Sequence, residues 1–523
     1  MTRTRSKPLI LVALLAASFL INLDTTLVNV ALPALTRELA ATTSQLQWVV
    51  DAYNLVFAAF LLTAGSFSDR FGRKGMLVVG LVVFGAASVI GGYVGTADHL
   101  IATRAVMGLG AAMTFPATLS LLTGVFTGRK ERALAIGLWG ATAGVAIALG
   151  PIVGGALLAH YSWSSIFFVL GPVAAAVIVL VLLFVPRAAP DRAHRLDPLG
   201  LVLSAGFMAA LIYTVIEAPD RGWNSAFTLT GFAVSLVLLV AFIVGERRTS
   251  APMLDVRLFR NMRFSAASAA VTISFFTLLG FIFLMTQFFQ FIRGYSALSA
   301  GVHLLPVATA VAVGSTLGTR LAVRLGNKLI VTTGLVLMAV FYFWVARDLD
   351  ASLSYGVIAV QMVVYGLGMG LTSAPATEAI MGAIPRAKAG VGSAVNDSTR
   401  LLGGTLGVAV MGSVYASLYA SKLTATLPSA LPASLAAIAH QSIGAAFEVS
   451  AQLAAQGHGA LGAAVHAASV IAFQHGLSVA CIVAGAVAVG GALLSVLFIP
   501  AHPEAEPVAP RLESVAWSEA SDR

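Results

Sequence analysis

The chain has 523 residues, of which 58% are apolar and only 10% charged, and its mean hydropathy is +0.92. Soluble domains need far more charge to cover their surfaces, so the composition excludes that class and indicates an integral membrane protein. The formal net charge is +9, and the single cysteine, Cys481, excludes an internal disulfide.

Fourteen apolar runs are long enough to cross a membrane as helices, since about 20 residues at 1.5 Å rise span ~30 Å. The first run lacks a small-residue cleavage site, so we expect a retained span rather than a signal peptide. The predicted spans are 8–33, 46–66, 76–96, 100–125, 133–158, 164–186, 198–217, 226–245, 264–291, 299–322, 328–346, 353–378, 398–420 and 472–499.

Basic residues alternate between dense and sparse segments, as the positive-inside rule requires of a correct span count. With the N-terminus inside, 24 of the 31 Lys and Arg residues fall on inside segments and 5 on outside segments. The net charge therefore follows from topology, and it requires no nucleic-acid partner. We predict a multi-pass membrane protein with both termini in the cytoplasm.

A weak repeat relates two parts of the chain. Aligning the turn before the third span with that before the eleventh matches Gly72 to Gly326 and Lys74 to Lys328. Two pseudo-symmetric six-helix bundles separated by two inserted helices would give this spacing, and such bundles rock against each other in transporters. We therefore predict an all-α integral membrane fold with 14 transmembrane helices: a first bundle at 1–196, inserted linker helices at 197–250, a second bundle at 251–500 and a disordered cytoplasmic tail at 501–523.

One long segment between the last two spans is too polar to cross the membrane. Residues 421–469 are Ala-rich with scattered Gln, His and Ser, and the topology places them outside. We expect an outer loop containing one or two short, weakly amphipathic helices, with a structural or gating role rather than a chemical one.

The short inside turn between the second and third spans combines glycine with charge. A tight turn needs glycine, and an acid beside clustered bases can form charge-assisted bonds that break as the bundles rock. Positive charge for topology alone would explain the bases but neither the acid nor the glycine spacing. We predict a conformational gating loop made by Gly65, Asp69, Arg70, Gly72, Arg73 and Lys74.

Ionisable side chains within the bilayer are costly and are therefore functional candidates. Counted from the predicted outer ends of their spans, Asp24 lies ~13 Å deep, Asp51 ~7 Å and Arg104 ~6 Å. Pairing Asp24 with Arg104 would offset the cost of both charges, and protonating Asp24 would release the arginine. The sequence thus predicts a proton-coupled switch, with a static ion pair as the alternative. Asp51 is either a third proton-coupling residue or an interfacial residue that faces water.

The fifth span carries glycines around a proline. Glycines three or four residues apart expose bare backbone and allow close helix approach, while Pro151 removes a backbone hydrogen bond and bends the helix. Ordinary packing of membrane helices explains part of this pattern. The additional feature is a kink at a defined place, made by Gly150, Pro151, Gly154 and Gly155.

Polar anchors among apolar side chains are typical of ligand cavities, although lipid-facing aromatic residues are an equally good interpretation of the Phe-rich stretch 281–291. The candidate cavity residues are Asn29, Phe281, Gln287, Phe288, Gln290, Asn396 and Arg400. We expect neither a metal nor a cofactor, because a proton gradient can drive transport alone.

In these motifs the chain resembles the major facilitator superfamily and, more narrowly, its fourteen-span drug:proton antiporter family (EmrB/QacA type). Phe67 stands where leucine is usual, and Ser164 and Ser165 replace a usual Arg-Trp pair. The resemblance implies proton-coupled export of varied, often cationic or amphipathic drugs across a bacterial plasma (inner) membrane, with Arg104 in proton coupling. It rests on residues 23–33, 65–74, 104–112, 150–155 and 389–404.

The predicted function is export of small molecules in exchange for protons by alternating access, and the chain is not expected to be an enzyme. A dedicated exporter of one endogenous metabolite or antibiotic would carry the same motifs, and only the resemblance of the fifth span disfavours an uptake symporter. The sequence holds neither the phosphate loop of an ATP-driven pump nor a catalytic cluster. Expected partners are protons, small molecules, the bilayer and, in a host with an outer membrane, a periplasmic adaptor protein.

Overall fold

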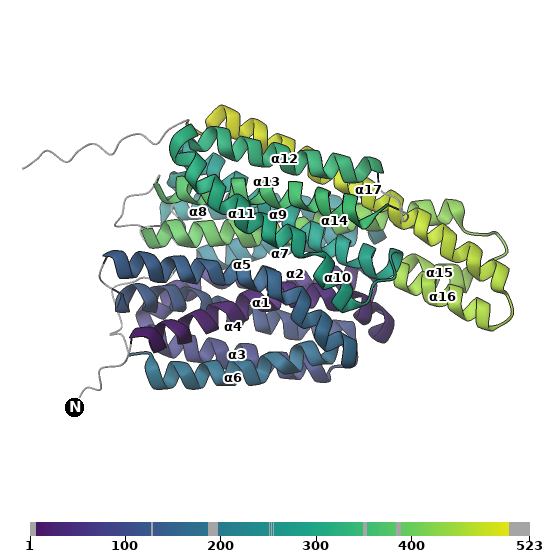
Figure 1. Ribbon diagram of the computed structural model, residues 1–523, viewed down its shortest axis with the longest axis horizontal. Helices are drawn as coiled ribbons and strands as arrows, with labels where there is room; N and C mark the ends of the chain where they lie inside the picture. Colours follow the sequence, from purple (N-terminus) through teal and green to yellow (C-terminus); the bar gives the residue numbers. More distant parts are fainter. Residues whose placement is uncertain are drawn as a thin grey trace, which may run out of the picture.

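A computed structural model describes residues 7–126, 129–186, 197–249, 252, 254, 256–348, 353–382 and 389–500, without some side chains in α2, α5, α13 and α14. The predicted tail at 501–523 lies outside these ranges. The described chain is an elongated bundle of long helices that run roughly along one direction (Figure 1).

The helices follow the predicted spans in order. The first six are α1 (Lys7–Leu39), α2 (Thr43–Phe71), α3 (Arg73–Tyr93), α4 (Ala97–Val125), α5 (Arg129–His160) and α6 (Ser164–Phe184), followed by α7 (Pro198–Arg221) and α8 (Ala226–Arg248). After a short 3-10 turn η1 (Val256–Arg260) come α9 (Met262–Gln287), its π-helical continuation η2 (Phe288–Ile292), α10 (Ala297–His303), α11 (Leu305–Leu325), α12 (Asn327–Asp348), α13 (Tyr355–Gly382), α14 (Ala389–Thr426), α15 (Ala433–Gln441), α16 (Ile443–Ala455) and α17 (Gly459–Phe498).

Within the described residues, twelve helical segments are long and apolar enough to cross a membrane, with α9–η2 and α10–α11 each counted as one. Two further long helices, α2 and α5, pack beside α4 and α1 in the same bundle. Each of the fourteen predicted spans therefore has its helix, and the chain is a multi-pass membrane protein. The tenth span is interrupted at Leu304, where Pro306 enters the first turn of α11 without a backbone N–H to donate.

Two groups of helices pack mainly within themselves. We call α1–α6 the first half and α9–α14 with α17 the second half, and we name the ends of the molecule inner and outer from the charge-based topology. The inserted helix α7 packs on α2 and α14, one from each half. Apolar side chains bury this contact at Leu55, Ile212 and Ala409, so α7 covers one of the two seams between the halves.

The outer segment 421–469 is more helical than a loop. The two short helices α15 and α16 are flanked by extensions of α14 and α17, and together they project from the outer end of the bundle (Figure 1). Its alanines favour helix, and the segment has a small apolar core of its own, formed by Leu431, Val449, Leu453 and Val465. The expected short helices are therefore present as α15 and α16, and the extensions of α14 and α17 add helix where a loop was expected. We call residues 421–469 the outer hairpin.

Close helix packing in the first half depends on bare backbone. A Cβ atom at Gly110 of α4 would lie 2.6 Å from the Phe84 amide nitrogen and 2.7 Å from the Gly80 carbonyl oxygen of α3. Both neighbours are backbone atoms in a helix, so neither can move aside cheaply.

We expect Gly110→Ala to lower thermal stability in detergent, because overpacking of this kind costs ~1–3 kcal/mol. The matched control is Gly95→Ala, since a Cβ there would meet nothing within 4 Å. Melting curves followed by tryptophan fluorescence would measure both variants, and equal midpoints would contradict the close packing of α3 on α4.

Candidate functional site

A buried ion pair joins α1 to α4. The Arg104 Nη1 donates to both carboxylate oxygens of Asp24, at 2.8 and 2.7 Å. The two side chains are 1% and 0% exposed. Each charge would be costly to bury alone, and pairing offsets much of that cost for both residues.

Two further groups hold Arg104 from α2. Its Nε donates to the Val49 carbonyl at 2.9 Å, and its guanidinium lies 4.4 Å from the centre of the Tyr53 ring. The Tyr53 hydroxyl in turn donates to the Ile21 carbonyl of α1 at 3.2 Å. Arg104 therefore keeps a hydrogen bond and a cation–π contact even when Asp24 is neutral. Such an arginine can stay in place while the carboxyl changes its charge.

Both residues of the pair lie further from the outer ends of their helices than the predicted span ends implied. α1 does not end at Pro33 but continues to Leu39, which places Asp24 15 residues, or ~22 Å, from its outer end. Arg104 is seven residues, or ~10 Å, into α4. The predicted distances of ~13 and ~6 Å were counted from the ends of the apolar runs, and each helix extends beyond its run.

Asp51 is separate from this pair. It is 0% exposed, and neither carboxylate oxygen has a hydrogen-bond partner among the described residues. At 100° per residue it lies on the side of α2 opposite Tyr53, on the face where Gln47 and Leu55 contact α14. The alternative that Asp51 faces water at the interface is therefore wrong. An isolated buried carboxyl is most stable as the neutral acid, which makes it a second place for a proton.

The predicted gating loop is a tight turn whose bases bind helix ends. Gly72 separates α2 from α3 with φ of +106°, a value that favours glycine. Lys74 Nζ donates to the Leu182 and Val185 carbonyls at the end of α6, at 2.9 and 2.8 Å. Arg73 Nη1 donates to the Ser120 carbonyl of α4 at 3.5 Å.

These bonds stay within the first half, and the Lys74 ammonium lies at the negative end of α6, where a positive charge is favourable. Gly65, Asp69 and Arg70 fall in α2, but their side-chain environment lies outside the described residues. Opening and closing by this loop stays a prediction.

The glycine-proline motif of α5 contacts both halves. A Cβ at Gly150 would collide with Thr26 of α1, whose hydroxyl donates to the Ala146 carbonyl at 3.1 Å. Gly154 lies on the same side, where a Cβ would approach the Leu27 carbonyl oxygen at 3.2 Å.

Gly155 instead packs on the backbone of α10, with the Ala297 carbonyl oxygen 2.7 Å from the position of a Cβ. Gly301 of α10 similarly meets the backbone of Pro151. The motif is thus wedged between α1 and α10, at the seam that α7 does not cover.

The candidate cavity residues fall into three groups by their contacts. Near α1, Gln290 Nε2 donates to the Val30 carbonyl at 3.0 Å, whereas Asn29 and Gln287 donate to their own helices. The Phe281 ring packs edge-on against Phe341 and tilted against Tyr365, and Phe288 lies near the outer end of α9. Further inward, Arg400 Nη2 donates to Thr377 Oγ1, which in turn donates to Asn396 Oδ1. These contacts do not place all seven residues around a single cavity.

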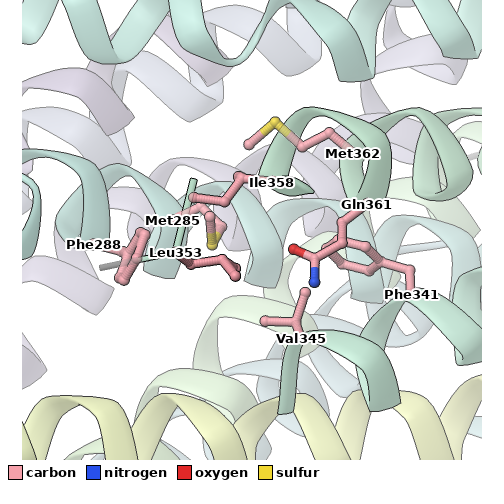
Figure 2. A pocket seen from close by; sticks show the side chains of 8 residues that line it. All are labelled: Met285, Phe288, Phe341, Val345, Leu353, Ile358, Gln361 and Met362. Atoms are coloured by element: carbon pink, nitrogen blue, oxygen red, sulfur yellow. The ribbon is translucent and has the colours of Figure 1, made fainter. Parts of the chain in front are cut away.

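A small cavity lies between α9, α12 and α13 in the outer part of the second half. Figure 2 shows Gln361 directed into it among apolar side chains that include Phe288, Phe341 and Val345. Its volume of about 10 Å³ has room for one water molecule. A transported compound therefore does not fit in this cavity.

Sequence reasoning missed Gln47 and Tyr53. Gln47 Nε2 donates to the Ala409 carbonyl at 2.9 Å, the Val408 carbonyl at 3.3 Å and Ser413 Oγ at 3.2 Å, all on α14. A glutamine in an apolar run one turn before Asp51 was a usable signal. Tyr53 carried no such signal, because tyrosine is common in membrane helices.

Comparison with known proteins gives a consistent result. A sequence model of the Major Facilitator Superfamily matches residues 14–408. The multidrug resistance protein Stp of Mycobacterium tuberculosis (strain CDC 1551 / Oshkosh) is 35% identical over 410 residues, 78% of this chain and 76% of that protein. The multidrug efflux pump LfrA of Mycolicibacterium smegmatis is 34% identical over 415 residues, 79% of this chain and 82% of that protein.

Among solved structures, a bacterial homologue of the human lysosomal transporter Spinster, in an inward-facing and unoccupied conformation, superposes with a TM-score of 0.67. The match covers 94% of this chain and 98% of the other, at 17% sequence identity, and so shows a shared fold.

We expect Arg104→Met to destabilise the protein by about 3–5 kcal/mol, because it leaves the Asp24 carboxylate buried without its partner. Adding Asp24→Asn should recover most of that loss, since the double variant holds no unpaired charge. Chemical unfolding of the two variants and the parent would measure this. A double variant less stable than Arg104→Met alone would contradict the assigned pairing.

Proposed function

The chain belongs to the major facilitator superfamily, in its fourteen-span drug:proton antiporter family, and we propose that it exports hydrophobic or cationic small molecules in exchange for protons. The members of this family are transporters and not enzymes. Among the described residues, no group of His, Cys, Asp and Glu could hold a metal ion. The observation that carries the proposal is the buried ion pair between Asp24 and Arg104.

A proton on Asp24 changes what binds α1 to α4. The neutral acid loses most of its attraction to Arg104, which remains on the Val49 carbonyl and the Tyr53 ring. α1 is also the helix that contacts the second half through Val30. Loosening α1 is therefore a direct way for a proton to change the contact between the halves.

Asp51 is the proposed second proton-coupling residue. It lies on the α2 face that packs on α14, so separation of the halves at this seam would expose its carboxyl to water. Exposure favours the charged form and burial the neutral form, so each opening and closing would release or bind a proton.

The breadth of substrates is proposed from relatives. Stp and LfrA are described as multidrug proteins, and the cavity residues predicted from sequence stay candidates for binding such compounds. We place the chain in a bacterial plasma membrane with both termini in the cytoplasm, divided into two rocking bundles with α7 and α8 between them. A periplasmic adaptor is a proposed partner only in a host with an outer membrane.

Cells that express the chain should export ethidium, and an uncoupler that collapses the proton gradient should stop this export. Fluorescence of preloaded cells, compared with cells lacking the chain, measures the rate. Export that continues undiminished with the uncoupler would contradict proton coupling. Failure to export any dye of a structurally varied panel would instead favour a dedicated exporter of one compound.

Asp24→Asn should abolish proton-driven export while the protein still inserts, because the amide has nearly the same shape but cannot exchange a proton. The matched control is Glu131→Gln, which removes the acid of an exposed ion pair between α1 and α5, with Lys7 Nζ 2.6 Å away. Exposed pairs contribute little, so this variant should export normally. Normal export by Asp24→Asn across the pH range would show that Asp24 is not the proton carrier.

A further inference from the structure

Two buried glutamines cross from one half to the other in opposite directions. Gln47 belongs to α2 of the first half and donates its amide to α14 of the second. Gln290 belongs to the π turn η2 of the second half and donates to the Val30 carbonyl of α1 in the first. They are 0% and 9% exposed. Each half therefore contributes one amide donor to the other half's backbone.

The backbone around each glutamine is adapted to this contact. Gly412 of α14 lies against Gln47, and a Cβ there would come within 2.6 Å of the amide nitrogen. Only a bare backbone leaves room for the side chain to reach the α14 carbonyls. Gln290 sits in the π turn Phe288–Ile292, a wider turn that changes the direction of side chains relative to a regular α-helix.

The accepting groups make these bonds easy to reverse. Val30, Val408 and Ala409 lie inside long helices, so their carbonyls already accept backbone hydrogen bonds and use a second lone pair for the glutamine. When the halves separate, the carbonyls stay satisfied, and only one amide at each place must be rehydrated. The net cost is small, because water replaces the protein acceptor.

Both contacts lie on the outer side of the acidic residues. Gln47 is one helical turn outward of Asp51 on the same face of α2. Val30 is six residues, or ~9 Å, outward of Asp24 along α1. While both glutamine contacts are formed, they lie between the outer end and the two carboxyls. They therefore hinder water from reaching Asp24 and Asp51 along the surfaces where the halves meet.

Other polar contacts between α2, α7 and α14 lie at the outer rim. Ser44 Oγ donates to Asp220 Oδ2 at 3.2 Å, and Trp223 Nε1 donates to Ser417 Oγ at 2.9 Å, both exposed. Water competes for those groups in every state, so they discriminate little between a closed and an open outer end. The buried glutamines do not meet that competition until the halves part.

We propose that Gln47 and Gln290 are paired latches that hold the outer ends of the halves together and release them by exchanging backbone carbonyls for water. They act as positioning residues for the exchange of substrate and protons. The inference rests on the proposed alternating-access function in one respect, since it assumes that the outer ends separate.

A cysteine reporter tests the latches directly. Cys481 is the only cysteine and is 3% exposed, so Thr36→Cys, at a position 2% exposed under Gly444 of the outer hairpin, introduces one thiol at the outer contact. In purified protein, a bulky maleimide should label this thiol only when the outer ends part. Labelling of Cys481, measured in the same sample, reports global unfolding.

Gln47→Met and Gln290→Met keep the length of the side chain and remove the amide donor. Each should raise the labelling rate at position 36 by about three- to tenfold, the effect of one net hydrogen bond, without raising that of Cys481. The two glutamines bind different helices and share no hydrogen-bond partner, so their effects should multiply in the double variant. Gly412→Ala, which displaces the Gln47 amide from the opposite helix, should act in the same direction and serves if Gln47→Met does not fold.

The matched control is Gln361→Met, which alters a glutamine of the second half that is 2% exposed and whose Nε2 has no partner among the described residues. It should label at the parent rate. Equal labelling of all variants, or the same acceleration by Gln361→Met, would overturn the latches. The assay uses neither substrate nor a proton gradient, so a failure of dye export would leave its result intact, and its failure would leave proton-driven export intact.

Discussion

The cost of burying charge controls the arrangement of the first half. Asp24 and Arg104 are almost completely excluded from solvent, and each needs the other. The arginine also needs the Val49 carbonyl and the Tyr53 ring, which brings α2 against α4. That approach is possible because Gly108 of α4 has no side chain where it meets the Tyr53 carbonyl. Three helices are thus aligned by one guanidinium.

A transporter must also keep its halves in contact without joining them permanently. Bare backbone provides one kind of contact, at Gly155 against α10 and at Gly301 against Pro151. Amide groups on backbone carbonyls provide the other, at Gln47 and Gln290. When either kind of contact opens, the backbone carbonyls involved keep their hydrogen bonds within their own helices. Opening therefore costs little, and the closed and open forms of the protein can be close in free energy. The helix α7 covers only one of the two seams, so the two seams differ from each other.

The ion pair and the seam contacts are connected through α1. Asp24 ties the middle of this helix to α4, while Thr26 and Leu27 pack on the α5 motif and Val30 accepts from Gln290. A change of charge at Asp24 therefore acts on a helix that already contacts the second half. No long pathway through the protein is required, since one helix carries both the acid and the contact.

The number of spans, their order and the Asp24–Arg104 pairing followed from the sequence alone, because apolar length and basic flanks are local properties, and two costly charges at similar depth leave few alternatives. Helix ends were less accessible: α1 passes through Pro33, and α14 and α17 extend into the outer hairpin, where only one or two short helices within a loop were expected. Only the tertiary structure decided that Asp51 faces α14 rather than Arg104, and that Gln47 and Gln290 cross the seam while Gln287 does not. Those outcomes depend on how each helix is rotated about its axis and which neighbour it meets, and residues that are far apart in the chain determine both.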